Sequence, residues 1–464
     1  MPEAAATTEL YAADRKIYPR AVHGWFAAWR WMLVWATQLV FYGGAWLTWN
    51  GRQAVLFDIV QRKFYVFGLV FWPQDVIYLA ILLIISALSL FLFTTVAGRL
   101  WCGYACPQTV YTEIFMWIER LIEGDRSRRM KLDGSVFSAR KAALKGAKHA
   151  AWIALALWTG FTFVGYFTPI RELWAEVTRL STGPWEAFWM LFYGFATYGN
   201  AGWMREQVCT YMCPYARFQS AMFDKDTLTI TYDQKRGEPR GPRARRADSK
   251  ALGLGDCVDC NICVQVCPTG IDIRDGLQYQ CIGCAACIDG CNQVMDKMGY
   301  PRGLIRYSTQ NAMERKLTGT QMIARTLRPR VLAYTAIVWA VIVATVLGLY
   351  LRVPLKVDVM RDRAAIAREV GRGDIENVYQ LRIMNTSERT RVFDIEVSGL
   401  PGLHLEGGAN VQVHGAASRL VPVRARVHVE GGPVGAGTHR IEFLVRARDE
   451  PAVRAHEKSV FVVR

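Results

Sequence analysis

Two long apolar segments without a single charged residue constrain this chain most. They run from residue 76 to 97 and from residue 331 to 351. A stretch of about 20 apolar residues crosses the roughly 30 Å hydrocarbon core of a bilayer as one helix. The sequence therefore predicts a membrane protein. The composition agrees, because 52% of the 464 residues are hydrophobic and 16 are tryptophan.

Three further segments predict membrane-spanning helices, at 26–49, 149–168 and 185–201. The first carries Arg30 and Gln38 but is otherwise apolar, and its tryptophans gather near its ends, as they do at membrane interfaces. It is too long for a cleavable signal peptide and lacks a small-residue cleavage pattern. We therefore expect a bundle of five transmembrane helices.

The distribution of basic residues predicts the orientation of these helices. Segments 98–148 and 202–330 carry ten and nineteen Lys and Arg residues, whereas 50–75 and 169–184 carry three and two. Loops rich in Lys and Arg stay in the cytoplasm. We therefore expect a multi-pass membrane protein, with a cytoplasmic N-terminus and its C-terminal domain on the opposite side of the membrane. The net charge of +16 reflects this topology and does not indicate a nucleic-acid partner.

An internal two-helix repeat carries a cysteine motif. The first two spans are followed by Cys102-Gly-Tyr-Ala-Cys106-Pro, and the next two by Cys209-Thr-Tyr-Met-Cys213-Pro. Both CxxxCP motifs fall on the same predicted face, where we expect them to meet across a pseudo-two-fold axis. The proline after each motif starts a helix well, and a helix N-terminus stabilises a thiolate.

Several chemistries suit four such thiols, namely Cu(I), a further iron–sulfur cluster or a redox dithiol. The alternative is that these cysteines are only small buried residues at helix ends. The duplication of the motif at equivalent positions disfavours that interpretation. The candidate copper or redox thiols are Cys102, Cys106, Cys209 and Cys213.

Eight of the twelve cysteines lie within 35 residues and have the spacing of a bacterial two-cluster ferredoxin. In that pattern each run supplies three ligands to one [4Fe–4S] cluster and its fourth cysteine to the other. The predicted ligands of cluster one are Cys257, Cys260, Cys263 and Cys291, and those of cluster two are Cys281, Cys284, Cys287 and Cys267. Structural zinc sites use pairs of CxxC instead. Asn292 stands where a proline is expected after the last cysteine.

Two adjacent clusters favour electron transfer as the function. His23 and His149 lie near the predicted membrane but no histidine lies in the middle of a predicted span, which disfavours a bis-histidine haem, and no GxGxxG motif opens a helix after a strand. Electrons are therefore expected to come from a partner.

The C-terminal tail changes character, because its apolar residues alternate with polar ones between glycine-rich turns, which predicts a small β-sandwich. The predicted organisation is a cytoplasmic N-terminus at 1–25, four spans with both CxxxCP motifs at 26–233, a basic linker at 234–250, a ferredoxin domain at 251–300, a connector at 301–330, the fifth span at 331–351 and the sandwich at 352–464.

The order of two CxxxCP motifs, a two-cluster ferredoxin run, a final span and a β-sandwich resembles the FixG/RdxA/CcoG family of bacterial cytochrome c oxidase accessory proteins. The resemblance covers nearly the whole chain, from the segment Arg15-Lys-Ile-Tyr-Pro-Arg20 onward. It implies that the tail is immunoglobulin-like, and that the chain is a multi-pass protein of a bacterial inner membrane with its ferredoxin domain in the cytoplasm and its C-terminal domain in the periplasm. It also implies reduction of Cu(II) to Cu(I) on the cytoplasmic side, in support of high-affinity haem–copper oxidase assembly, with the CxxxCP cysteines as copper-handling thiols. Oxidase assembly factors or a copper transporter are the implied partners.

Two alternatives remain open at this stage. The first four spans and both cysteine classes also resemble the NapH-type membrane ferredoxins, which implies quinol oxidation, although those proteins lack the sandwich. The third hypothesis is a non-catalytic assembly scaffold. The sequence does not determine whether the chain is an enzyme. It also leaves open the electron donor, the partner of the tail and the oligomeric state, for which a homodimer is one candidate.

Overall fold

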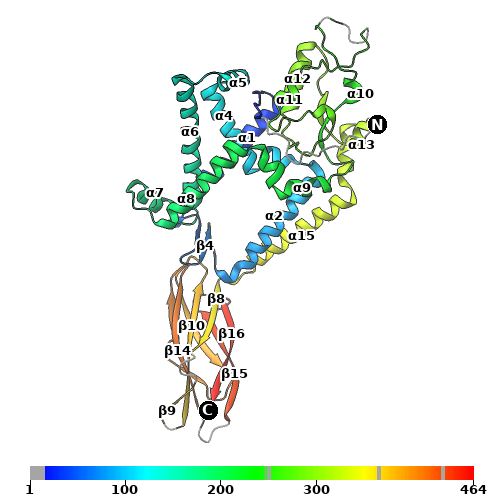
Figure 1. The fold of residues 1–464 in the computed structure, drawn as a ribbon. Helices are drawn as coiled ribbons and strands as arrows, with labels where there is room; N and C mark the ends of the chain where they lie inside the picture. Colours follow the sequence, from blue (N-terminus) through cyan, green and yellow to red (C-terminus); the bar gives the residue numbers. More distant parts are fainter. Residues whose placement is uncertain are drawn as a thin grey trace, which may run out of the picture. The chain divides into compact units, whose positions relative to one another are not determined.

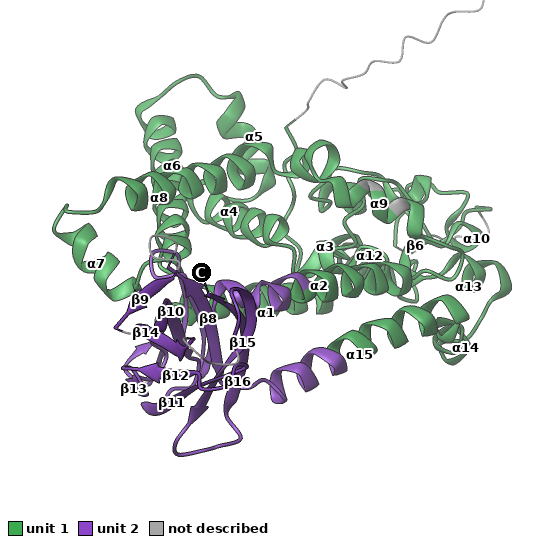
Figure 2. Cartoon of the chain, turned by 90° about the horizontal axis from the view of Figure 1, so that it is seen from below, with its two compact units in different colours: residues 1–46, 81–342 green, residues 47–80, 343–464 purple. Residues whose placement is uncertain are grey.

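The computed structural model describes residues 16–245, 247, 252–362, 367–371, 373–429 and 434–463. Parts of the predicted N-terminal segment and of the predicted basic linker therefore lie outside the described residues. The chain forms two compact units (Figure 2). One comprises Met1–Trp46 and Ile81–Ile342, and the other comprises Leu47–Ala80 and Val343–Arg464.

Helices dominate the first part of the first unit (Figure 1). They are α1 (Trp25–Gly44), α2 (Val76–Ala97), α3 (Leu100–Tyr104), α4 (Pro107–Glu123), α5 (Arg126–Gly134), α6 (Ala139–Val164), α7 (Ile170–Thr178), α8 (Pro184–Thr197), the π-helices η2 (Tyr198–Met204) and η3 (Val208–Met212), and α9 (Pro214–Met222).

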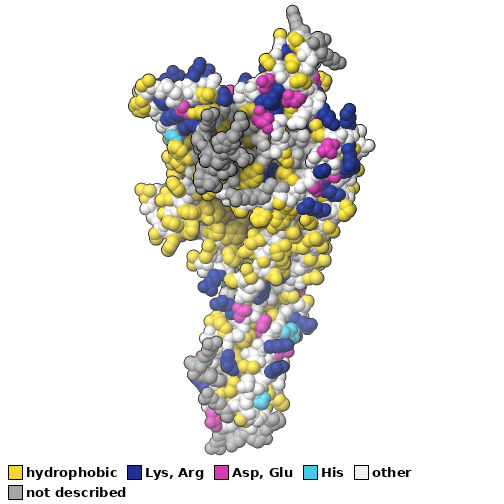
Figure 3. Space-filling view, turned by 45° about the vertical axis from the view of Figure 1, so that its right-hand side comes forward, with side chains coloured by type: hydrophobic (Ala, Val, Ile, Leu, Met, Phe, Trp, Pro, Cys, Tyr) yellow, Lys and Arg dark blue, Asp and Glu magenta, His cyan; other side chains and the backbone are white. Residues whose placement is uncertain are grey.

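Two helices among the described residues are long and apolar enough to cross a membrane, at Pro73–Ala97 and Pro329–Tyr350. They contribute to the broad apolar zone seen in Figure 3. The expected bundle of five spans is therefore not reproduced. Helix α8 has 14 residues by itself and continues directly into η2, and the lysines of α6 all precede residue 149, where the predicted span begins. Helix α1 contains the buried residues Arg30 and Gln38.

The cysteine-rich region forms a small sheet flanked by short helices. Strand β6 (Thr229–Tyr232) pairs antiparallel with β7 (Ile305–Ser308). The remaining elements are α10 (Gln234–Gly237), α11 (Ile262–Gln265), η4 (Ile273–Asp275), α12 (Ala286–Met298), α13 (Gln310–Arg315), α14 (Gly319–Ala324), η5 (Arg325–Leu327) and α15 (Pro329–Tyr350).

The N-terminus of α1 docks onto helix α12 of this region. The carboxylate of Asp289 accepts hydrogen bonds from the backbone N–H groups of Ala27, at 2.8 Å, and Phe26, at 3.4 Å. Negative charge at a helix N-terminus is favourable because the first N–H groups have no partner within the helix. Arg30, one turn further along α1, donates to the carbonyl oxygen of Cys284 at 3.3 Å. These bonds hold the ferredoxin region against α1.

Two antiparallel sheets make up most of the second unit, which confirms the predicted β-sandwich. One has the order β12-β14-β10-β8, with β9 beside β10, and the other has the order β13-β11-β15-β16. Buried aromatic side chains fill the space between them, and the rings of Tyr379 and Phe443 lie 5.0 Å apart in an edge-on contact. The strands are β8 (Leu355–Arg361), β9 (Arg368–Val370), β10 (Asp374–Asn385), β11 (Arg391–Ser398), β12 (His404–Glu406), β13 (Asn410–Val413), β14 (Ser418–His428), β15 (Gly437–Ala447) and β16 (Arg454–Val463).

The segment between α1 and α2, which the sequence suggested only as a loop, forms short strands within the second unit. These are β1 (Thr48–Trp49), β2 (Arg52–Gln53), β3 (Val55–Asp58), β4 (Lys63–Val66) and β5 (Leu69–Phe71), followed by the short 3-10 helix η1 (Pro73–Asp75). Val70 and Trp72 are buried in one cluster with Met384 of β10. Buried Asp75 pairs with Arg352 at 2.7 Å and with Lys356. Apolar burial and ion pairs therefore join this segment to the C-terminal domain.

Candidate iron–sulfur and thiol centre

Two loops of the same geometry present the ferredoxin cysteines. Asn261 directly follows Cys260, and Ala285 directly follows Cys284; both have a left-handed backbone, with φ of 55° and 59°. A helix starts immediately afterwards in each case, the short α11 at Ile262 and the longer α12 at Ala286. Non-glycine residues adopt this conformation rarely, so its repetition at equivalent positions marks the two runs as structural duplicates.

Cysteines from both runs lie near one another in the folded ferredoxin region, and the two ligand sets stay a prediction. One cavity is lined by Cys267, Cys281, Cys284 and Cys287, with Cys263 also on its wall. The remaining walls include Ile230, Ile273 and Ile282. In the second group, Cys291 interacts electrostatically with Cys263, Cys257 and Cys260. Thiol donors around an apolar cavity fit a [4Fe–4S] cluster.

The CxxxCP motifs end at helix N-termini, as predicted. Cys106 and Cys213 have extended backbones and directly precede α4 and α9, whose first residues are Pro107 and Pro214. Proline disfavours a helical conformation in the residue before it and tolerates the first helical position.

The two CxxxCP motifs lie near each other in the structure. Cys209 interacts electrostatically with Cys106, Cys102 and Cys213. Gln219, which is fully buried, places its side-chain amide nitrogen 3.4 Å from the sulfur of Cys102. The expected meeting of the two motifs is therefore confirmed.

Burial changes the electrostatics that the sequence suggests for these thiols. It raises the pKa of Cys102 to about 11 and that of Cys209 to about 12. Burial also raises the pKa of Cys106, although the backbone N–H groups of Gln108 and Thr109 in α4 act in the opposite direction. The expectation that the helix N-terminus stabilises a free thiolate is therefore wrong here, because desolvation of the charged form outweighs these hydrogen bonds.

The first CxxxCP motif packs directly against the second ferredoxin loop. A methyl group added to Gly103 would lie 2.8 Å from the carbonyl carbon and oxygen of Gly283 and 2.9 Å from the Cα of Cys284. Cys102 packs in the same apolar cluster as Cys284 and Cys287. The CxxxCP site and the cavity of predicted cluster two are therefore neighbours within the first unit.

Arg99, directly before α3, reinforces this contact. Its guanidinium donates to the carbonyl oxygens of Ala216, at 2.5 Å, and Tyr279, and it lies over the Tyr279 ring, 5.0 Å from the ring centroid. One buried arginine thus links the first CxxxCP segment to α9, which follows the second motif, and to the loop that carries Cys281.

A buried ion network, which the sequence analysis missed, supports the centre. Glu119 of α4 pairs with Arg129 at 2.9 Å, with Arg205 at 3.0 Å and with Lys148 at 3.8 Å. Burial alone would raise the pKa of Glu119, but these cations outweigh it and lower the pKa. Arg205 lies between η2 and η3, just before the second CxxxCP motif. No local pattern could have paired two residues 86 positions apart.

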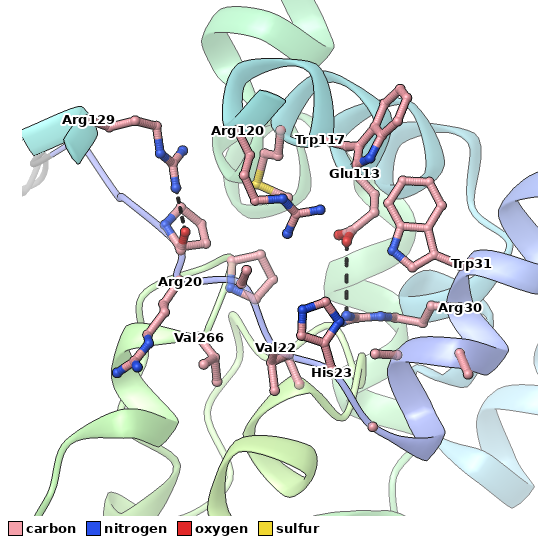
Figure 4. Close-up of a pocket in the computed structure, with 18 residues that line it drawn as sticks. Arg20, Val22, His23, Arg30, Trp31, Glu113, Trp117, Arg120, Arg129 and Val266 are labelled. Atoms are coloured by element: carbon pink, nitrogen blue, oxygen red, sulfur yellow. Dashed lines mark hydrogen bonds and ion pairs between the residues drawn. The ribbon is translucent and has the colours of Figure 1, made fainter. Parts of the chain in front are cut away.

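A cavity of about 310 Å³ lies where the N-terminal segment, α1 and α4 meet the ferredoxin region (Figure 4). The side chains of His23 and Arg120 point into it, and the indoles of Trp31 and Trp117 lie side by side, with centroids 6.0 Å apart. Its lining includes Pro268, which directly follows Cys267. The cavity therefore adjoins the loop of a predicted cluster-two ligand.

Comparison with protein families assigns three parts of the chain. Residues 204–310 match a 4Fe-4S dicluster domain, and residues 79–125 match a 4Fe-4S binding domain. Residues 345–464 match the IG-like fold at the C-terminal of FixG. The predicted iron–sulfur region and immunoglobulin-like tail are therefore confirmed.

Full-length relatives support the same assignment. The nitrogen fixation protein FixG of Rhizobium meliloti (strain 1021) is 36% identical, with 97% of this chain and 93% of that protein covered. Protein RdxA of Cereibacter sphaeroides is 39% identical, with 95% of each chain covered. Protein RdxB of the same organism is 37% identical, with 98% of each covered. With such identity over nearly its whole length, the chain belongs to the FixG/RdxA family and is a membrane iron–sulfur electron-transfer protein.

Proposed function

We propose that this protein passes single electrons from its ferredoxin region to the CxxxCP site and reduces Cu(II) to Cu(I) there. The product would serve the maturation of a high-affinity haem–copper cytochrome c oxidase. The contact of Gly103 with Gly283 and Cys284 carries this proposal, because it leaves no intervening layer of protein between the two thiol centres.

The proposed cluster ligands are the two groups of four cysteines described above. [4Fe–4S] clusters held there would supply one-electron transfer at a potential set by hydrogen bonds and solvent exposure. Cu(II) takes up one electron and becomes Cu(I), a soft ion that thiolates bind well. The thiols of the CxxxCP site suit both the donation of the electron and the first binding of the product.

We further propose that α1, α6 and α8 lie in the membrane with α2 and α15. Large apolar side chains on these helices face outward, among them Leu39 and Val40 on α1, Leu157 on α6 and Phe195 on α8. Exposed apolar side chains on this scale suit a lipid environment. With five spans, the Lys- and Arg-rich loops and the ferredoxin region face the cytoplasm and the C-terminal domain faces the periplasm.

Removal of the CxxxCP thiols is expected to slow copper reduction by at least about tenfold, equivalent to about 1.4 kcal/mol of activation free energy. The protein is reduced anaerobically, Cu(II) is added, and Cu(I) capture by a chromogenic chelator is followed together with reoxidation of the clusters. The variant carries serine at Cys102, Cys106, Cys209 and Cys213. Met212→Leu is the matched control, since it changes an exposed sulfur side chain in η3 and keeps every thiol. Equal rates in the quadruple variant and the unmodified protein would refute the proposed role of these thiols.

A second candidate function, quinol oxidation, is favoured by the cavity in Figure 4. Aromatic walls suit a quinol ring, and His23 and Arg120 offer polar groups for its oxygens. Oxidation of one quinol releases two electrons and two protons. Each predicted cluster would take up one electron, and His23 and Glu113, which line the cavity, would accept the protons.

The quinol hypothesis predicts that a short-chain quinol bleaches the oxidised protein anaerobically. His23→Gln combined with Arg120→Gln should slow this reaction at least about tenfold, while reduction by dithionite stays unchanged. Arg302→Gln is the control, because Arg302 is exposed and paired with Asp296, and neither residue lines the cavity. A quinol that leaves the protein unbleached would exclude this function.

A further inference from the structure

We propose that the buried residues Arg30 and Arg99 raise the reduction potential of predicted cluster two, whose proposed ligands include Cys281 and Cys284. The inference rests on those proposed ligands and deepens the proposed function, because it names two residues outside the cysteine motifs that would favour electron transfer toward the CxxxCP site. The potential itself is measured without copper.

Arg30 is the only charged residue of helix α1. It is 7% exposed, and its guanidinium donates to the carbonyl oxygen of Cys284 at 3.3 Å. The carboxylate of Glu113 lies 4.0 Å away, at the limit of an ion pair (Figure 4). Among the described residues, the Nε of Arg30 has no hydrogen-bond partner. A buried cation costs free energy unless negative charge lies nearby, so an anionic group beside Cys284 would stabilise Arg30.

Arg99 approaches the same loop from the turn between α2 and α3. It is also 7% exposed, and its guanidinium donates to the carbonyl oxygens of Cys281, at 3.4 Å, and of Tyr279. A third hydrogen bond goes to the carbonyl oxygen of Ala216. Carbonyl oxygens satisfy the donors of a guanidinium but carry no net charge. These bonds therefore leave the positive charge of Arg99 uncompensated.

Two cations thus converge on one loop of predicted ligands. Cys281 and Cys284 offer their carbonyl oxygens to different arginines, and these arginines stand 182 and 254 positions earlier in the chain. Both arginines belong to the same compact unit as the ferredoxin region. The fold therefore concentrates buried positive charge at predicted cluster two.

The arginines near the other predicted cluster are compensated or screened. Arg274 is buried, but it pairs with Asp259, within the first cysteine run, at 2.6 Å and with Asp272 at 2.5 Å. Arg243 donates to the carbonyl oxygen of Cys257 at 3.3 Å, but its side chain is only half-buried, so solvent and salt screen its charge. The excess of buried positive charge is therefore greater at predicted cluster two.

This charge has a direct consequence for the reduction potential. One-electron reduction adds negative charge to a cluster that four thiolates already make anionic. A nearby cation stabilises the reduced state more than the oxidised state, and it does so more strongly where burial lowers the effective dielectric constant. The electron would then reside on the cluster next to the first CxxxCP motif, since Cys102 and Cys284 pack in one group of apolar side chains.

Potentiometry of the full-length protein tests the inference, with anaerobic purification and electron paramagnetic resonance of the reduced clusters. Arg30→Gln and Arg99→Gln should each lower the equilibrium constant for reduction of the same cluster at least about tenfold, equivalent to about 59 mV for one electron. Arg30→Lys and Arg99→Lys keep the charge and should largely restore the potential. Arg302→Gln is the matched control, because Arg302 is exposed and pairs with exposed Asp296, and it should change neither potential.

Glu113→Gln provides a test of opposite sign. It removes the carboxylate beside Arg30 and should raise the potential that Arg30→Gln lowers, by at least about threefold in the equilibrium constant. Loosened packing around the cluster would not produce shifts of opposite sign. The Glu113 side chain is 19% exposed, so this variant keeps the test valid if an arginine variant does not fold.

The outcomes separate this inference from the copper proposal. Unchanged potentials in Arg30→Gln and Arg99→Gln, with their iron content intact, would overturn the inference, and so would a lowered potential in Glu113→Gln. Shifted potentials without any formation of Cu(I) would support the inference and refute the proposed function. Thiol-dependent formation of Cu(I) together with unchanged potentials would do the reverse.

Discussion

Gly103→Ala should lower the rate of Cu(II) reduction at least about tenfold, or about 1.4 kcal/mol in activation free energy. The added methyl group would lie 2.8 Å from the backbone of Gly283, and backbone atoms cannot rotate away as a flexible side chain can. Overpacking of this kind costs about 1–3 kcal/mol, and it is relieved when the two segments move apart. Electron transfer falls steeply with distance, so even a small separation of the two thiol centres slows the reaction.

Gly146→Ala is the matched control. Gly146 also lies in a helix, α6, but a methyl group there meets nothing within 4 Å. The rates of Cu(I) capture and the visible absorbance of the clusters are measured for both variants. Unchanged copper reduction in Gly103→Ala, with its iron content intact, would show that the close contact between the motifs does not limit electron transfer.

Glu119→Gln should be the most destabilising single change in the helical unit. Glu119 is buried and lies within ion-pair distance of Arg129, Arg205 and Lys148, all of which are also buried. Removing one partner of a buried ion pair leaves uncompensated charge and costs about 3–5 kcal/mol. The free energy of unfolding in detergent, followed by tryptophan fluorescence during denaturant titration, should fall by that amount.

Lowering the pH should reduce the free energy of unfolding of the unmodified protein in the same way. In the folded protein the pKa of Glu119 lies below its ordinary value. The contribution of its carboxylate to the free energy of unfolding is therefore complete above the unfolded pKa of about 4.3 and is lost as the pH falls through the folded pKa. Asp296→Asn is the control, because its partnership with Arg302 is exposed to solvent. If Glu119→Gln unfolds like the Asp296→Asn control, the buried cations do not depend on Glu119.

The ion pairs of Glu119 also help to position the CxxxCP site. Gln108, at the start of α4, donates to the carbonyl oxygens of Asn200 and Arg205, at 2.9 Å and 3.1 Å. Together with the Glu119–Arg205 pair, these bonds fix the connection that leads to Cys209. Glu119 and Gln108 are therefore positioning residues for the CxxxCP site, and Glu119→Gln should also slow copper reduction.

Features encoded by neighbouring residues could be predicted from the sequence. The spacing of Cys257 to Cys291 identified the ferredoxin region, and the prolines after Cys106 and Cys213 marked helix starts, because each signal acts within a few residues. Alternating apolar residues likewise identified the β-sandwich. The grouping of the eight cysteines followed from the same spacing.

Features that depend on contacts between distant segments could not be predicted from the sequence. Short strands between α1 and α2 escaped prediction because strands of two to four residues show little alternation, and their burial depends on Met384 far along the chain. The predicted spans at α6 and α8 stay predictions, because the span 149–168 begins after the lysines of α6 and α8 continues directly into η2.

By itself, the sequence determined which residues are predicted to carry the chemistry, since cysteine spacing and the prolines beside it are local properties of the chain. Only the tertiary structure decided how those residues are joined. Three contacts bring together segments about 90 to 180 residues apart. They are the contact of Gly103 with Gly283, the pairing of Glu119 with Arg205 and the meeting of the two CxxxCP motifs. Such contacts arise from the packing of whole helices and loops, and no local pattern of residues specifies them.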